Sequence, residues 1–138
     1  LSVSSAASDV YKRQIDIGAD FGISPGFETE IIKYAKENKF SHIPGVSTAS
    51  EIISCLKFDC KFLKLFPAEP LGGISYLNSL SGPFPDVSFC PTGGINSGNY
   101  LSWLSQKNVL CVGGSWIAPK NDNNYDKIKK RALEVLKN

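Results

Sequence analysis

Short apolar runs alternate with amphipathic stretches from residue 15 to residue 138. Each run ends in proline, glycine or small polar residues, and the stretch after it carries apolar residues at helical spacing. This alternation is typical of βα units that build a parallel sheet. The pattern predicts strands at 19–24, 41–46, 62–66, 87–92 and 109–112, and helices at 28–38, from 48 onward, at 71–80, 97–106 and 125–137.

Local signals predict several boundaries. Thr48-Ala49-Ser50-Glu51 is a capping box, in which the threonine hydroxyl and the glutamate carboxylate each accept from the other's backbone amide. Pro91 cannot donate to a strand ladder, so it should end its strand. Ser97 is expected to cap the fourth helix, and a short helical turn is expected after Trp116. The inward face predicted for the last helix consists of Tyr125, Ile128, Ala132 and Val135.

The third strand carries a lysine among apolar residues. Because side chains alternate along a strand, Phe62, Lys64 and Phe66 share one face, and the two leucines between them share the other. A strand apolar on both faces is typical of a parallel sheet covered by helices, where an ammonium group finds little water. Burial lowers a lysine pKa from about 10.4 toward about 7 to 8, where a neutral amine forms Schiff bases with carbonyl substrates. The alternative is a lysine that pairs with a carboxylate or extends to solvent.

Two glycine pairs lie where a strand is expected to meet a helix, in Thr92-Gly93-Gly94 and in Gly113-Gly114-Ser115. Glycine lets backbone N–H groups approach an anion, and a following helix N-terminus adds a favourable dipole. Two such loops on the last two strands match the phosphate site that α/β barrels build after their seventh and eighth strands. The alternative is that these glycines serve tight turns only.

Other polar and aromatic residues favour structural roles. His42 lies in an apolar run and is interpreted as an interior or strand-end residue. Glu69 follows the lysine strand, where a structural role is favoured over proton transfer. Trp103 and Trp116 are interpreted as core or interface residues.

The βα repeat fits either an open doubly wound sheet or part of an eight-stranded barrel. No G-x-G-x-x-G follows the first strand, which disfavours a dinucleotide-binding sheet. A length of 138 residues suits one domain, and 42% hydrophobic with 20% charged residues indicates a soluble globular protein.

Composition also narrows the partners. The net charge of +2 comes from scattered basic residues, so nucleic acid is not expected. No apolar run approaches the ~20 residues of a membrane span. The cysteines lack metal-ligand spacing, so no metal is expected, and a reducing cytoplasm fits them best. These cysteines are Cys55, Cys60, Cys90 and Cys111, of which the last two lie in strand-like runs as small hydrophobes.

Residues 1–14, LSVSSAASDVYKRQ, differ from the rest of the chain in lacking a hydrophobic period. Their last six residues resemble the translation of a transposon-end adaptor used in sequencing libraries. We expect residues 1–14 to be a non-native segment and residues 15–138 to form the domain. The alternative is a natural flexible N-terminal tail.

Six short motifs follow one another from about Gly18 to the C-terminus. They are ISPG at 23–26, IPG and ST within 43–48, K-FPAE at 64–69, GPF at 82–84, FCPTGGI at 89–95 and VGGSW at 112–116. In this order they resemble the bacterial 2-keto-3-deoxy-6-phosphogluconate / 4-hydroxy-2-oxoglutarate aldolase family.

The resemblance implies an eight-stranded α/β barrel, a homotrimer when complete, that works without metal or other cofactor. It implies cleavage of 2-keto-3-deoxy-6-phosphogluconate to pyruvate and glyceraldehyde 3-phosphate, or of 4-hydroxy-2-oxoglutarate to pyruvate and glyoxylate. By matching position, Lys64 is the Schiff-base lysine, Thr92 lies near the pyruvyl carboxylate and Phe66 lines the pocket. The residues implied for the phosphate are Gly93, Gly94, Gly113, Gly114 and Ser115.

Two functional residues of the family have no match here. Its general-base glutamate and carboxylate-binding arginine lie on strands that precede the equivalent of Ala19. We therefore expect residues 15–138 to be the C-terminal five βα units of a (β/α)8 TIM barrel, with the N-terminal strands missing. Alone, such a fragment is expected to be inactive, aggregation-prone and open to water, which would return the pKa of Lys64 to near its ordinary value.

Two other functions stay open. The chain is either another phosphate-binding barrel enzyme, such as a sugar-phosphate isomerase or epimerase with a structural Lys64, or a catalytically incomplete phosphate-binding fragment.

Overall fold

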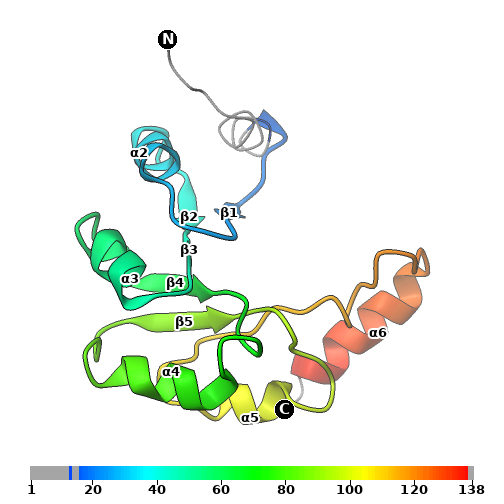
Figure 1. Cartoon of the computed structure of the whole chain (residues 1–138). Coiled ribbons are helices and arrows are strands. Elements are labelled where there is room, and N and C mark those ends of the chain that lie inside the picture. The colour runs from blue at the N-terminus through cyan, green and yellow to red at the C-terminus, as the bar shows by residue number, and fades with distance from the viewer. Residues whose placement is uncertain (1–12, 14–15, 137–138) are drawn as a thin grey trace.

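The computed structural model describes residue 13 and residues 16–136, which form an α/β structure of parallel strands and covering helices (Figure 1). The strands are β1 (Phe21–Ile23), β2 (Ser41–Ile43), β3 (Gly45–Val46), β4 (Phe62–Leu65) and β5 (Ser88–Pro91). The helices are α2 (Thr29–Glu37), α3 (Ala49–Leu56), α4 (Gly73–Ser81), α5 (Tyr100–Leu104) and α6 (Tyr125–Leu136). The prediction of alternating strands and helices is therefore confirmed for the described residues. The expected non-native segment 1–14 lies, apart from residue 13, outside them.

All strand pairs are parallel and join strands that follow one another in the chain. β1 pairs with β2, and β3, β4 and β5 form a second sheet in that order. The single strand expected at 41–46 is divided between the two sheets at Pro44. Proline has no N–H to donate, which interrupts the ladder. Its carbonyl still accepts from the backbone N–H of Lys64 at 2.9 Å, so the chain stays beside β4 as it passes from β2 to β3.

The strand expected at 109–112 is present only as two isolated bridges to β5, Phe89 with Val109 and Thr92 with Gly113. Between these bridges β5 advances by three residues and its neighbour by four. One residue is therefore unmatched, as in a β-bulge, and the ladder cannot continue from one bridge to the next. The segment still runs parallel to β5 as its outer neighbour.

The helix boundaries follow their capping side chains. In α3 the capping box is confirmed: the Thr48 hydroxyl accepts from the Glu51 amide at 3.3 Å, and the Glu51 carboxylate accepts from the Thr48 amide at 2.8 Å. The cap predicted at Ser97 is wrong, because α5 starts only at Tyr100. Asn96 and Asn99 side chains accept backbone amides in this loop at 2.8 Å, which holds residues 96–99 in turns instead of a helix.

The C-terminal part differs from the sequence expectation in two places. A turn, and no helix, follows Gly114. In α6 the side chain of Tyr125 is 84% exposed, so it does not belong to the predicted inward face. Arg131 connects this helix to the preceding loop through hydrogen bonds to the Ile117 carbonyl at 2.7 Å and to Asp122 at 2.6 Å.

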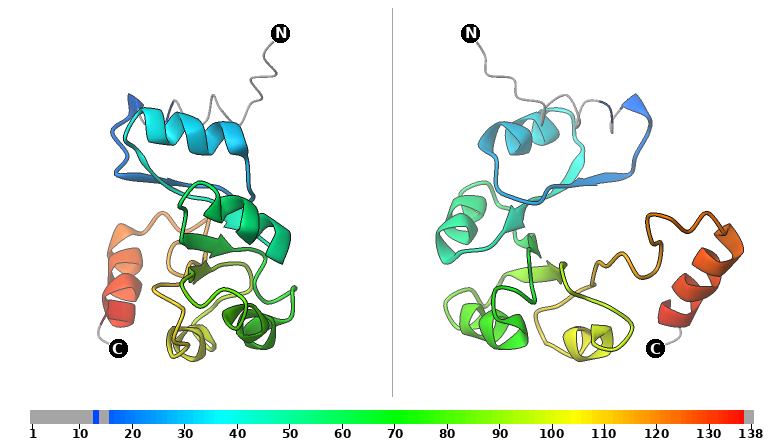
Figure 2. Two further views of the ribbon diagram at one scale, coloured as in Figure 1. Left: turned by 90° about the vertical axis from the view of Figure 1, so that its left-hand side faces the viewer. Right: turned by 45° about the vertical axis from the view of Figure 1, so that its right-hand side comes forward.

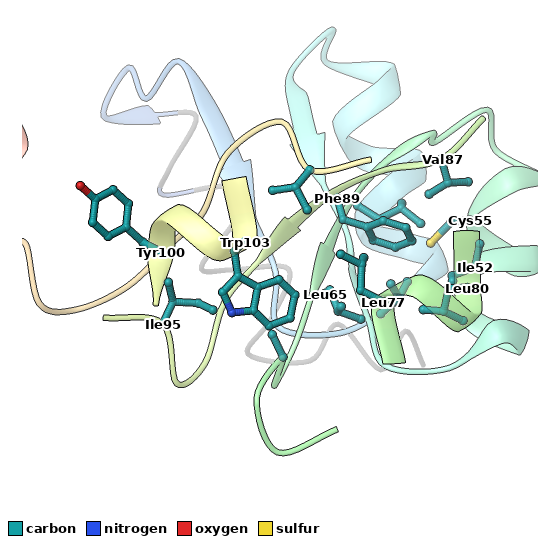
Figure 3. Packing of buried hydrophobic residues seen from close by; sticks show 14 residues of the cluster. Ile52, Cys55, Leu65, Leu77, Leu80, Val87, Phe89, Ile95, Tyr100 and Trp103 are labelled. Carbon is teal, nitrogen blue, oxygen red and sulfur yellow. The ribbon is translucent and has the colours of Figure 1, made fainter. Parts of the chain in front are cut away.

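The helices α2, α3, α4 and α5 follow one another along the outer side of a curved row of strands (Figure 2). The core lies between this outer side of β4 and β5 and the helices, where Leu65, Leu77, Phe89 and Trp103 are fully buried (Figure 3). The prediction that both faces of the lysine strand are buried is wrong. Only its two leucines are fully buried, whereas Phe62 and Lys64 on the other face are half-buried.

No helix among the described residues is long and apolar enough to cross a membrane.

Candidate active site

Strand β4 places the Lys64 side chain on the inner face of the curved row. Its neighbours in register are Gly45 on β3 and Cys90 on β5, so on one side no side chain stands beside it. The Lys64 Nζ lies 4.6 Å from the centroid of the Phe66 ring, which follows it on the same face. Burial lowers the pKa of Lys64 below its ordinary value, although the Cys90 thiol acts in the opposite direction. The expectation that an open interior would return this pKa to its ordinary value is therefore wrong.

A pocket of about 820 Å³ lies over the inner face of β4 and β5 and reaches past their carboxyl ends to the loops that follow. All the residues proposed for the site from the sequence line it, although they come from positions up to 51 residues apart in the chain, from Lys64 to Ser115. The structure thus brings together Lys64, Phe66, Thr92, Gly93, Gly94, Gly113, Gly114 and Ser115.

Several lining residues were not identified from the sequence as site residues. Phe62 shares the Lys64 face by alternation, so its position could have been deduced. Cys90 and Cys111 were interpreted as small hydrophobes of two strands, and no local signal shows that they face the same cavity. The far wall is formed by apolar residues of β1 and β2, namely Phe21, Ile23 and Ile43.

Thr92, which lines this pocket, has an unsatisfied hydroxyl. Its Oγ1 atom is buried and has no hydrogen-bond partner among the described residues. The backbone around it is held in place, since its N–H donates to the Leu65 carbonyl at 2.9 Å and its carbonyl accepts from Ala68 at 2.7 Å. A buried hydroxyl without a partner destabilises the folded chain by about 1–3 kcal/mol, so a ligand that supplies the partner gains affinity.

The glycines of the two loops are required by close packing, in addition to lining the pocket. Gly94 has a φ of +87°, and a Cβ there would lie 2.5 Å from the Cβ of Glu69. A Cβ on Gly114 would overlap the ring of Trp116. The Gly113 N–H donates to the Pro91 carbonyl at 3.0 Å, so that amide is already engaged. Because α5 begins six residues after Gly94 and α6 begins only at Tyr125, no helix N-terminus directly follows either loop, and the expected helix dipole does not act there.

Glu69 has a structural role, as the sequence analysis favoured. Its Oε1 accepts from the Trp103 indole N–H at 2.7 Å and from the Asn99 amide at 3.1 Å, which joins the loop after β4 to α5. Trp103 is fully buried, and Trp116 stacks on Tyr100 with ring centroids 5.9 Å apart. The Glu69 hydrogen bonds hold the loop after β4 against α5, and neither Glu69, Asn99 nor Trp103 lines the pocket.

His42 is also interior. Burial lowers the pKa of His42 to about 4, while a backbone hydrogen bond with Gly22 raises it. The imidazole is therefore neutral at pH 7, which agrees with its place inside β2.

Few ionisable side chains line the pocket. Among the described lining residues there is no carboxylate and no arginine, and the ionisable groups are the Lys64 amine and the thiols of Cys90 and Cys111. An amine with a lowered pKa can attack a carbonyl carbon, and apolar walls with a hydroxyl can hold a small keto acid. The described pocket offers a nucleophile but no carboxylate for proton transfer.

These features define a class: a parallel α/β protein with a lysine pocket on the inner face of its strands. The chain belongs to the KDPG and KHG aldolase family, whose sequence model matches residues 6–131. The resemblance deduced from the six motifs is thereby confirmed.

Individual relatives agree with this assignment. The chain is 44% identical over 124 residues to the KHG/KDPG aldolase of Escherichia coli K12, which covers 88% of this chain and 58% of that protein. It is 45% identical over 122 residues to the 2-dehydro-3-deoxy-phosphogluconate aldolase of Pseudomonas aeruginosa, with coverage of 86% and 56%. The chain thus spans less than two thirds of the length of these relatives.

Solved structures show the same fold. The KDPG aldolase of Legionella pneumophila, with pyruvate captured as a covalent carbinolamine intermediate, has a TM-score of 0.85 at 41% identity, covering 91% of this chain and 62% of that one. The 2-keto-3-deoxy-6-phosphogluconate aldolase of Zymomonas mobilis with 3-phosphoglycerate has a TM-score of 0.84 at 35% identity, with coverage of 91% and 59%.

Proposed function

We propose that this chain carries the Schiff-base part of a class I aldolase, a carbon–carbon lyase. The reaction is cleavage of 2-keto-3-deoxy-6-phosphogluconate to pyruvate and glyceraldehyde 3-phosphate, or of 4-hydroxy-2-oxoglutarate to pyruvate and glyoxylate. The observation that supports it most directly is Lys64, an amine with a lowered pKa in the pocket wall. The covalent pyruvate carbinolamine of the Legionella relative supports the same chemistry.

The lysine performs the bond-making steps. Neutral Lys64 attacks the C2 ketone of the substrate, and the carbinolamine loses water to give a protonated imine. The imine accepts the electron pair of the C3–C4 bond when that bond breaks, which leaves an enamine on Lys64 and releases the aldehyde. Protonation and hydrolysis then release pyruvate and regenerate the amine.

Two neighbours orient the keto acid for attack. The Thr92 hydroxyl, buried and without a partner, donates to the pyruvyl carboxylate. Phe66 packs against the carbon chain from the same face as Lys64. The proton of the C4 hydroxyl needs a base, and the described lining contains no carboxylate for it.

The phosphate binds at the loops that contain the glycine pairs. Gly93, Gly94, Gly113, Gly114 and Ser115 line one end of the pocket, and the absence of side chains on four of them leaves room for an anion. With the Gly113 amide engaged, the other backbone amides and the Ser115 hydroxyl bind the phosphate oxygens. Because the phosphate binds away from Lys64, its binding energy positions the reacting carbon beside the amine.

The complete protein is proposed to be a (β/α)8 barrel of the cytoplasm that assembles as a homotrimer and uses no cofactor. Residues 15–138 supply its C-terminal five βα units, and residues 1–14 are a non-native segment. The parallel order of the strands, the helices on their outer side and the 62% coverage of the Legionella chain support this architecture. The nucleophile is in this part, and the base and the carboxylate-binding arginine come from the remainder.

Trapping the imine tests the proposal. The chain is incubated with pyruvate and borohydride, digested with trypsin and mapped by mass spectrometry, in parallel with the chain preceded by the N-terminal residues of the Escherichia coli relative. An adduct on Lys64 prevents cleavage after it, so the adduct appears in a peptide of residues 62–107. Lys64→Arg should abolish it, because a guanidinium stays protonated.

Lys61→Arg is the matched control, since Lys61 is exposed and lies just before β4. It should leave the trapping yield unchanged. An adduct on Lys57 or Lys61, or none in either protein, would contradict the aldolase proposal and favour a phosphate-binding enzyme in which Lys64 is structural.

A further inference from the structure

Cys90 and Cys111 stand side by side in the wall of the pocket. Cys90 belongs to β5, and counting back from the bridge between Thr92 and Gly113 places Cys111 directly opposite it. Both residues line the pocket, so their side chains point to the same side of the sheet. The aldolase steps described above use neither thiol.

The two thiols influence each other's titration through a side-chain hydrogen bond, and Cys90 is buried in the wall whereas Cys111 is exposed to solvent. This bond lowers the pKa of Cys111 to about 7, so a large share of Cys111 is thiolate at neutral pH. The same bond, together with burial, raises the pKa of Cys90. Cys111 is thus a solvent-accessible nucleophile, and Cys90 is a neighbouring thiol that can react with the oxidised Cys111.

The backbone geometry suits a covalent link. Residues opposite each other on neighbouring strands lie roughly 4.8 Å apart, and the Cα atoms of disulfides are about 4.4–6.8 Å apart. The unmatched residue between the two bridges leaves this segment without a continuous ladder, so the small adjustment that an S–S bond requires meets little resistance.

We propose that Cys90 and Cys111 form an oxidation site, which a hydroperoxide converts into an intrachain disulfide in the pocket wall beside Lys64. The site is independent of the proposed aldolase activity, because it depends only on the two thiols and their register.

The reaction proceeds in two balanced steps. The Cys111 thiolate attacks the terminal peroxide oxygen, the O–O bond breaks, and an S–O bond forms in a sulfenic acid. The alkoxide or hydroxide that departs takes from solvent the proton that the thiol released on ionising. The Cys90 sulfur then attacks the Cys111 sulfur, the S–O bond breaks, and the leaving hydroxide takes the Cys90 proton as water. Two thiols have lost two electrons, and the hydroperoxide has gained them.

The other two cysteines provide an internal comparison. Burial raises the pKa of Cys55 to about 12 and also raises the pKa of Cys60, so neither is thiolate at neutral pH. They also line no part of the pocket. They should stay reduced under conditions that oxidise Cys90 and Cys111.

The experiment treats the full chain with hydrogen peroxide at pH 7, alkylates the remaining thiols and digests the protein with trypsin without reduction. Each cysteine falls in its own tryptic peptide: residues 40–57, 58–61, 65–107 and 108–120. We expect a species that joins 65–107 to 108–120 and loses two hydrogen atoms, and its disappearance with dithiothreitol. Only two of the four cysteines should then carry the alkyl label, because the other two are joined in the disulfide.

Cys111→Ser and Cys60→Ser are matched variants. After the same treatment Cys111→Ser should keep all its remaining thiols, whereas Cys60→Ser should still form the link. Equal alkylation of all four cysteines in the unaltered chain, over-oxidation of Cys111 with Cys90 still free, or a link between two chains would each overturn the proposal.

Discussion

Two side chains in the pocket do not suit their surroundings unless a ligand binds there. Lys64 carries an amine on a half-buried face, where its pKa is lowered. Thr92 keeps a buried hydroxyl that has no hydrogen-bond partner in the described part of the chain. Both arrangements reduce the stability of the folded chain, as is common at enzyme sites, and under the proposed function they would bind a carbonyl and a carboxylate.

Replacing Thr92 with valine should separate these two effects. Because valine has nearly the same shape and no hydroxyl, Thr92→Val should raise the free energy of unfolding by about 1 kcal/mol in urea titrations. The yield of pyruvate adduct on Lys64 should fall several-fold. Thr48→Val is the contrasting variant, because that hydroxyl caps α3 and its loss should cost about 1 kcal/mol. A similar loss of stability in both variants would contradict the view that Thr92 has no partner.

Ser115 gives a cleaner test of the proposed phosphate subsite than the glycines do. A side chain at Gly94 or Gly114 collides with its neighbours, so a change there alters the fold as well. Ser115 is exposed at the pocket rim, and Ser115→Asp should weaken binding of 3-phosphoglycerate about tenfold by charge repulsion, measured by calorimetry. Ser97→Asp, an exposed serine outside the pocket lining, should bind as before. Equal weakening by both would assign the effect to overall charge.

Among the structural elements, α3 has an N-terminal cap in which one carboxylate, that of Glu51, accepts several hydrogen bonds. One carboxylate oxygen of Glu51 accepts from the Ser47 amide and hydroxyl and from the Thr48 amide and hydroxyl, at 2.8 to 3.0 Å. Burial raises the pKa of Glu51, but these hydrogen bonds outweigh it and the pKa is lowered. The loop between β3 and α3 is therefore secured by a charged group.

Glu51→Ala should reduce the free energy of unfolding by about 1–2 kcal/mol at pH 7. Because the pKa is lowered in the folded state, this contribution is complete above the ordinary pKa of 4.5 and disappears as the pH falls through the lowered value. The difference between the original chain and Glu51→Ala should thus shrink below about pH 4.5 in denaturant titrations.

Glu30→Ala is the matched control, because Glu30 also lies in the first turn of a helix but pairs with Lys33 at an exposed site. Its effect should stay below about 0.5 kcal/mol. A Glu51 effect as small as this, or one that does not depend on pH, would refute the importance of the cap.

At the scale of the whole molecule, the row of strands has one covered side and one open side. Helices cover the outer side, and the pocket occupies the inner side. At the β1 end the apolar side chains of Phe21 and Ile23 are 55% and 36% exposed. Exposed apolar residues on an edge strand favour pairing with further strands, in agreement with the proposed barrel.

If the complete protein is the proposed barrel, with the base outside this chain, imine formation and cleavage should give different results. The chain itself should form the Lys64 adduct with pyruvate yet release no pyruvate from 4-hydroxy-2-oxoglutarate, because its described pocket contains no carboxylate. The chain preceded by the N-terminal residues of the Escherichia coli relative should release it, as measured by coupled reduction of pyruvate. Robust cleavage by the shorter chain would show that a base lies within it.

Much of the local structure could be predicted from the sequence. The capping box of α3, the end of β5 at Pro91 and the position of Lys64 on a strand depend on residues a few places apart. The misassigned cap at Ser97 has a local cause too, because the Asn99 and Asn96 side chains accept from the Asn96 and Gly98 amides and hold this loop in turns. The family could be recognised because its motifs are also local strings.

Other features were decided only by the tertiary structure, because they depend on the register between strands that are distant in the sequence. The one-residue mismatch beside β5 replaced the fifth predicted strand by two bridges, and the same register brings Cys90 and Cys111 together. Whether Thr92 finds a partner, and which face of β4 the helices leave uncovered, likewise follow from packing across the sheet. The sequence by itself determined which residues form strands and helices and which motifs the chain contains, because those depend on near neighbours. Burial, pKa and pairing required the assembled sheet, because each is set by atoms that lie far away in the chain.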